Sequence, residues 1–244
     1  MQAWGEVARR LAHEIKNPLT PIQLSAERLE YKLARKLEGQ DQAVLVKGVK
    51  TIVDQVDAMK RLVNEFRDYA RLPAAQLHPI NLNALLTDIM HMYDFEGPMP
   101  RHQVHLVCEL DERCPDILGD AMQLRQVVHN LIQNALDACE APGSHEDMPT
   151  VTVRTQWLEN ARRVRLSIVD TGPGFSDMIL KRAFEPYVTT KDKGTGLGLA
   201  VVKKIAEEHG AQIDLGNRVN NGTVAGAQVS LSFNIPGPQS EAVS

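Results

Sequence analysis

The sequence is poor in cysteine, in aromatic residues and in long apolar runs, and each shortage excludes a class of protein. Three cysteines are too few and too odd in number for a disulfide framework, so a reducing, cytoplasmic setting is expected. An aromatic fraction of 5% favours a helix-rich protein with aliphatic cores over a β-sandwich. The chain has no run of ~18 apolar residues, and its first residues lack the apolar region of a signal peptide, so no membrane span is expected within it.

An excess of positive charge is also missing. The chain has 27 Lys and Arg against 31 Asp and Glu, a formal net charge of −4, which argues against a nucleic-acid partner. Hydrophobic residues make up 43% and charged residues 24%, as in an ordinary folded protein. At ~150 residues per domain, the 244 residues fit one or two domains.

Residues 1–72 have the pattern of two antiparallel helices with a turn around Gly39. Apolar residues recur at alternating steps of four and three, as in a heptad seam. The seam of the second helix consists of Leu45, Val49, Ile52, Val56, Met59, Val63 and Phe66; that of the first consists of Trp4, Ala8, Leu11, Ile15, Pro18, Ile22, Ser25 and Leu29. One hairpin cannot cover both seams, so a homodimer that forms a four-helix bundle is expected.

The rest of the chain predicts an α/β sandwich. Pro73 and Pro79 break the helical pattern and indicate a linker over residues 73–80. From 81 to 236, a central sheet with helices on one face is the simplest arrangement of the periodic segments. The expected helices cover 83–93, 120–140 and 198–209, and the expected strands cover 103–110, 150–158, 163–169, 211–215 and 227–233. Residues 237–244 are expected to be a disordered tail.

His13 is predicted to face water on the first helix. It takes an outer heptad position, and Asn17 lies one turn further on the same face. A lone exposed histidine is usually only solvated, but Glu14 could take a proton from the ring and Asn17 could position a water. Pro18 cannot donate to the carbonyl of Glu14, which predicts a bend one turn beyond the histidine.

Three further clusters together indicate a nucleotide site, although the chain has no G-x-x-x-x-G-K-[ST], H-R-D or D-F-G motif. Asn130 and Asn134 share a helix face and could present amide oxygens to a metal–phosphate group. Asp170 ends an apolar strand, where its carboxylate could accept a hydrogen bond from an exocyclic amine. Gly172 and Gly174 would let the backbone approach a flat ring.

The third cluster, Gly194-Thr195-Gly196-Leu197-Gly198, leads directly into a predicted helix. Spaced glycines at a helix N-terminus expose N–H groups and the positive end of the helix dipole to an anion. Lys191 and Lys193 could add positive charge. The glycine-, proline- and charge-rich stretch from 171 to 198 has the composition of a lid that closes over a ligand.

These motifs, with Phe184-Glu185-Pro186-Tyr187, resemble in the right order the H, N, G1, F and G2 boxes of bacterial two-component sensor histidine kinases. The stretch around His13 is most similar to nitrogen-regulation kinases of the NtrY kind. The resemblance covers nearly the whole chain. It implies a dimerisation and histidine-phosphotransfer (DHp) hairpin over 1–72, followed over 81–236 by an ATP-binding domain of the Bergerat (GHKL) fold.

The resemblance also implies what the site residues do. His13 would be the phosphoacceptor, Glu14 the base for autophosphorylation and Asn17 the residue that positions water for phosphatase activity toward a response regulator receiver domain. ATP and Mg²⁺ would be the cofactors. Their ligands would be Asn134 for Mg²⁺, Asn130 for the phosphates, Asp170 for the adenine amine, and the glycine motifs with Lys191 and Lys193; Phe184 would help to pack the lid.

Two departures from the family pattern and two alternatives remain. Asp137 stands where many sensor kinases have a basic residue. The sensor and membrane segments that are usual for the family are missing. The chain is therefore expected to be either the catalytic fragment of a protein that could be membrane-anchored, or a short member of the family.

The alternative function is a nucleotide-binding dimeric scaffold or a simple ATPase, but hydrolytic relatives of the fold have glutamate where Asn130 stands. A metal site from His102, His105, Cys108 and Cys114 is disfavoured, because alternate strand positions diverge and Cys108 falls on an apolar stripe predicted to be core.

Overall fold

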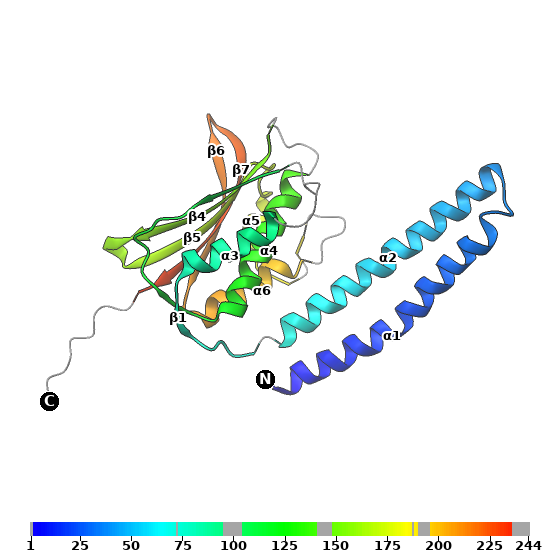
Figure 1. Cartoon of the computed structure of the whole chain (residues 1–244), viewed down its shortest axis with the longest axis horizontal. Coiled ribbons are helices and arrows are strands. Elements are labelled where there is room, and N and C mark those ends of the chain that lie inside the picture. The colour runs from blue at the N-terminus through cyan, green and yellow to red at the C-terminus, as the bar shows by residue number, and fades with distance from the viewer. Residues whose placement is uncertain are drawn as a thin grey trace. The chain divides into compact units, whose positions relative to one another are not determined.

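Helices α1 (Gln2–Leu33) and α2 (Gly39–Arg71) form an antiparallel hairpin (Figure 1). The structure is a computed structural model that describes residues 2–71, 73–94, 104–140, 148–186, 188–189 and 196–235. Helix α1 continues through both Pro18 and Pro21. The turn between the helices ends at Gly39, whose φ of 59° lies in the left-handed region that glycine adopts at little cost.

The hairpin buries every seventh residue of each helix. The prediction for the first seam was partly wrong, because Pro18 and Ser25 are exposed while positions omitted from it are buried. A contact between only two helices covers about one seam position per heptad, and small alanines let the helix backbones approach closely. The buried residues, each at most 4% exposed, are Ala12, Leu19 and Ala26 on α1 and Val49, Val56 and Val63 on α2.

Among the described residues, five large apolar members of the two predicted seams are exposed, and they are called the apolar stripe below. Its members also recur at intervals of seven, and each is between 41% and 53% exposed. A row of large apolar side chains with this spacing has the geometry of a further helix–helix contact. The apolar stripe consists of Ile15, Ile22 and Leu29 on α1 and Ile52 and Met59 on α2.

Residues Ala74–Val188, together with the chain from Gly198 on, form an α/β unit around a five-stranded sheet. The strand order is β2-β4-β5-β7-β6, with β2 parallel to β4 and all other neighbours antiparallel. The strands are β2 (His105–Glu109), β4 (Thr150–Leu158), β5 (Arg163–Asp170), β6 (Gln212–Asn220) and β7 (Thr223–Asn234). The predicted order, a helical hairpin followed by an α/β layer, is confirmed.

Helices α3 (Leu82–Asp94), α4 (Ala121–Cys139) and α6 (Gly198–Glu208) cover one face of this sheet (Figure 1). Alternate residues of the two central strands point into the core, as strand geometry requires. On β5 these are Val164, Leu166 and Ile168, and β7 opposes them with Phe233, Leu231 and Val229. Apart from Phe233, these core residues are aliphatic, as the low aromatic content predicted.

Four short elements were not predicted. Strand β1 (His78–Ile80), inside the predicted linker, pairs antiparallel with β3 (Ile117–Gly119). Helix α5 (Asp177–Arg182) lies inside the predicted lid, and a 3-10 turn covers Glu159–Ala161. Each has six residues or fewer, too short for hydrophobic periodicity to emerge from the sequence. The predicted tail, 237–244, lies outside the described residues.

Candidate functional site

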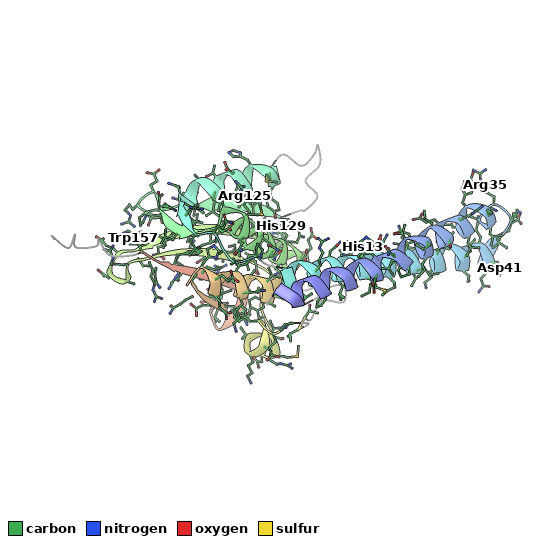
Figure 2. The ribbon with its side chains drawn as sticks, turned by 90° about the horizontal axis from the view of Figure 1, so that it is seen from below. His13, Arg35, Asp41, Arg125, His129 and Trp157 are labelled. Carbon is green, nitrogen blue, oxygen red and sulfur yellow. The ribbon has the colours of Figure 1, made fainter. Side chains whose placement is uncertain are left out.

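His13 lies about three turns into α1 and its side chain is exposed, as predicted (Figure 2). Glu14 and Asn17 are also exposed, whereas Ala12 beside them is buried. The buried positions of α1 are shifted by one residue from the predicted seam. In both the predicted and the observed register, His13 lies outside the row of buried residues. An imidazole in this position is accessible to a large partner without any rearrangement of the hairpin.

In the α/β unit, helix α4 brings two predicted asparagines to the start of α6. Asn130 and Asn134 are one turn apart and half-buried. A Cβ built on Gly198, the first residue of α6, would lie 3.7 Å from Nδ2 of Asn134. The asparagine motif and the last glycine of the glycine-rich motif, far apart in the sequence, therefore meet at one place. There the free N–H groups of a helix N-terminus can join an amide side chain in binding an anion.

Asp170 occupies the end of the central strand β5 and is 6% exposed. Its Oδ1 accepts hydrogen bonds from the backbone N–H of Gly172 at 2.9 Å and of Ala227 at 3.1 Å. The first bond closes the turn after β5, and the second ties the carboxylate to β7. Two backbone donors thus orient the carboxylate before any ligand arrives.

Glycine is required at two positions of the loop that follows Asp170. A Cβ on Gly172 would lie 2.9 Å from the carbonyl oxygen of Ala138, one turn beyond Asn134 on α4. Gly174 has φ of 79°, and a Cβ there would lie 2.5 Å from Cγ1 of Val224. The loop therefore passes over the C-terminal half of α4, the half that also carries Asn134.

Sequence reasoning missed the residues of β6 and β7 that complete this loop. Gly226 has φ of 137°, and a Cβ on it would lie 1.9 Å from the carbonyl oxygen of Asp170. Asn217 hydrogen-bonds to both backbone groups of Phe175. Thr171 accepts from the N–H of Thr150 at 2.9 Å. The one available signal was Gly226 itself, since glycine inside a strand often marks close backbone approach.

Four residues of the predicted lid, Lys191, Lys193, Gly194 and Thr195, lie outside the described residues. Gly196 has a left-handed φ of 70°. Leu197 is fully buried.

Phe184 is half-buried, and Nζ of Lys203 on α6 lies 5.9 Å from the centre of its ring. Within the same segment, Ser176 caps α5 by accepting from the N–H of Ile179. The predicted roles of these residues stay predictions.

A hydrogen-bonded frame at the other ends of α4 and α6 keeps the two helices in register. Asp120 caps α4 by accepting from Met122 and Gln123, and its own N–H donates to Nε2 of His209 at 2.9 Å. Since Nε2 of His209 accepts this bond, Nδ1, which lies 2.8 Å from the carbonyl oxygen of Ile205, is the donor nitrogen of this buried ring. Partial burial raises the pKa of the Asp120 carboxyl. The hydrogen bonds that it accepts from the backbone N–H groups of Gln76, Gln123 and Met122 lower that pKa by more, so it lies below its ordinary value.

Other kinds of site find no support in the part of the chain that the structure describes. No group of three or more His, Cys, Asp or Glu there could hold a metal ion. The prediction that Cys108 is a core residue was wrong: it is exposed, because β2 is an edge strand. His102 lies outside the described residues. Among the described helices, none combines the length and the apolar character needed to cross a membrane.

Comparison with known protein families divides the chain at the same place as the structure. Residues 3–75 match the His Kinase A (phospho-acceptor) domain. Residues 119–235 match the histidine kinase-, DNA gyrase B-, and HSP90-like ATPase domain. The two matches cover, respectively, the hairpin with His13 and the unit in which Asn134, Asp170 and Gly198 lie.

Among curated proteins, the nitrogen regulation protein NtrY of Azorhizobium caulinodans is 37% identical over 98% of this chain. An NtrY-like sensor histidine kinase of Rickettsia bellii is 34% identical over 96% of it. The chain spans 30% and 36% of the lengths of these relatives. Among solved structures, full-length ShkA in complex with AMPPNP is 26% identical with a TM-score of 0.63, over 93% of this chain and 45% of that one.

Proposed function

Because the chain belongs to the sensor histidine kinase family, we propose that it transfers the γ-phosphoryl group of ATP to His13 and then to a response regulator. The observation that carries this proposal is the convergence of Asn134, the Asp170 loop and Gly198 in one unit, in a chain whose other unit carries an exposed histidine. ShkA, which is similar to 93% of this chain, has been crystallised with the ATP analogue AMPPNP. The similarity to NtrY supports a role in nitrogen regulation.

In the proposed reaction, the unprotonated ring nitrogen of His13 attacks the γ-phosphorus. A nitrogen–phosphorus bond forms, the bond from the γ-phosphorus to the bridging oxygen breaks, and ADP leaves. The exposed Glu14 accepts the proton that the ring loses. A receiver-domain aspartate then takes the phosphoryl group from His13, and Asn17, one turn further along α1, positions water when the phosphoaspartate is hydrolysed.

The α/β unit would hold the nucleotide in the orientation that this reaction needs. Asp170 would accept a hydrogen bond from the adenine amine, and Asn130 with the start of α6 would orient the phosphates. The amide oxygen of Asn134 suits a hard cation, so Asn134 would hold Mg²⁺, which neutralises phosphate charge when bound. Asp137, which accepts from Nε2 of Gln133 at 2.9 Å, is acidic where many sensor kinases have a basic residue. Positive charge for the phosphates would therefore come from elsewhere, such as Lys191 or Lys193.

The test of the proposal is the chemistry of the phosphorylated product. We expect incubation with γ-labelled ATP and Mg²⁺ to label the chain with a phosphoramidate, which acid removes and alkali does not. Label that survives acid would indicate a phosphate ester and contradict the proposal. Release of inorganic phosphate without any labelling would favour the alternative, an ATPase of the same fold.

We also propose that the chain acts as a homodimer, with the apolar stripe of one hairpin packed against that of its partner in a four-helix bundle. Replacing both Ile22 and Ile52 by lysine should convert the dimer to a monomer, because each dimer would bury four unpaired charges. Analytical ultracentrifugation measures the change.

The control is Leu24→Lys, which adds one lysine at an exposed position of α1 away from the apolar stripe. The control should remain dimeric. A double variant that still sediments as a dimer would show that the apolar stripe is not the interface.

A further inference from the structure

A side chain from the edge strand β6 holds the loop that follows Asp170. Asn217 accepts a hydrogen bond at Oδ1 from the N–H of Phe175 at 2.6 Å, and its Nδ2 donates to the carbonyl of Phe175 at 2.8 Å. Both backbone groups of Phe175 are thereby bonded to one amide. The Asn217 side chain pairs with the backbone N–H and carbonyl of Phe175, as the backbone of a neighbouring strand does in a sheet.

The same amide stands next to the group proposed to recognise the base. Asn217 pairs with Ala227 across β6 and β7, and the N–H of Ala227 donates to Oδ1 of Asp170 at 3.1 Å. Asp170 and Asn217 therefore hold the two ends of one loop, each from its own strand and on either side of Ala227. Gly174 lies between them, and a Cβ on it would come within 2.8 Å of Oδ1 of Asn217.

We infer that Asn217 is a positioning residue for adenine recognition, an inference that rests on the proposed function. By clamping Phe175, it holds the Gly172–Gly174 turn at one distance from the Asp170 carboxylate, so that the two present a preformed edge to the base. A loop ordered before the ligand arrives spares binding the entropy of ordering it. In this proposal Asn217 acts on the loop that meets the base, and not on the phosphates or on His13, so it should affect nucleotide affinity and base choice but not the transfer step.

The experiment compares ATP and GTP, which share phosphates but differ at the exocyclic group that Asp170 would recognise. Calorimetric titration of the whole chain with each nucleotide gives two dissociation constants. For Asn217→Ala we expect the Kd of ATP to rise about ten-fold, equivalent to ~1.4 kcal/mol, and that of GTP to change far less. The rate of His13 labelling at saturating ATP should stay within about two-fold of wild type.

The matched control is Asn220→Ala, an exposed asparagine three residues further along β6, which should leave both dissociation constants unchanged. A role limited to general stability would weaken ATP and GTP binding equally and lower the labelling rate with them. That result, or wild-type ATP affinity in Asn217→Ala, would overturn the inference.

A second variant decides the question if Asn217→Ala does not fold. Asn217→Asp keeps the acceptor for the N–H of Phe175 but sets a carboxylate oxygen against its carbonyl, so discrimination between ATP and GTP should again fall. If Asn217→Asp folds and discriminates between ATP and GTP as the wild type does, the inference is overturned while the proposed function stands. If the wild-type chain does not bind ATP, the proposed function fails, and this inference falls with it.

Discussion

Replacing His13 by glutamine is expected to abolish phosphorylation of the chain by ATP while nucleotide binding persists. The side chain is exposed, so the substitution leaves the core of the hairpin intact, and glutamine is a good helix former. The nitrogen of its amide has no available lone pair to attack phosphorus. Loss of an essential nucleophile typically lowers the rate by more than ~10³-fold.

The measurement is incorporation of label from γ-labelled ATP, together with the Kd of ATP from calorimetry. His105→Gln is the matched control, since His105 is also exposed but lies on the edge strand β2 of the α/β unit. The control should label as the wild type does. Wild-type labelling of His13→Gln would remove His13 from the mechanism, whereas loss of ATP affinity in that variant would assign it a structural role.

Substituting Gly226 by alanine is expected to lower the free energy of unfolding by at least ~3 kcal/mol. A Cβ at this position would lie 1.9 Å from the carbonyl oxygen of Asp170, and the φ of 137° is one that L-residues rarely adopt. The clashing atom is backbone at the end of the central strand β5, so it cannot rotate away. Relief requires β7 to move off β5, which also breaks the bond from Ala227 to Asp170.

Urea unfolding measures the change in the free energy of unfolding. Two other glycines, one on β6 and one in the turn between β6 and β7, provide controls with smaller expected losses. A Cβ on Gly216 would meet nothing within 4 Å, and its φ is ordinary, so Gly216→Ala should be nearly neutral. A Cβ on Gly222 also meets nothing within 4 Å, but its φ is 80°, so Gly222→Ala should lose ~1–2 kcal/mol from backbone strain alone. If Gly226→Ala proves as stable as Gly222→Ala, the close approach of β7 to Asp170 is wrong.

Local patterns in the sequence determined the elements and most of the residues that we propose to act in catalysis and nucleotide binding. The hairpin and the major strands and helices followed from periodicity, because each residue's burial repeats with the period of its own element. The exposure of His13 followed for the same reason. The motifs at Asn134, Asp170 and Gly198 could be found because their residue types suit one chemistry at short, local spacings.

Only the tertiary structure decided which of these local features meet. No spacing along the chain places Gly198 beside Asn134, or Gly226 and Asn217 around the loop that follows Asp170, since those contacts depend on strand order and register. It also decided that Ala12, Leu19 and Ala26, rather than the larger residues of the apolar stripe, are buried in the hairpin, and that Cys108 lies on an exposed edge. Periodicity gives the face of a helix or strand that is apolar, but what covers that face is set by elements distant in the sequence.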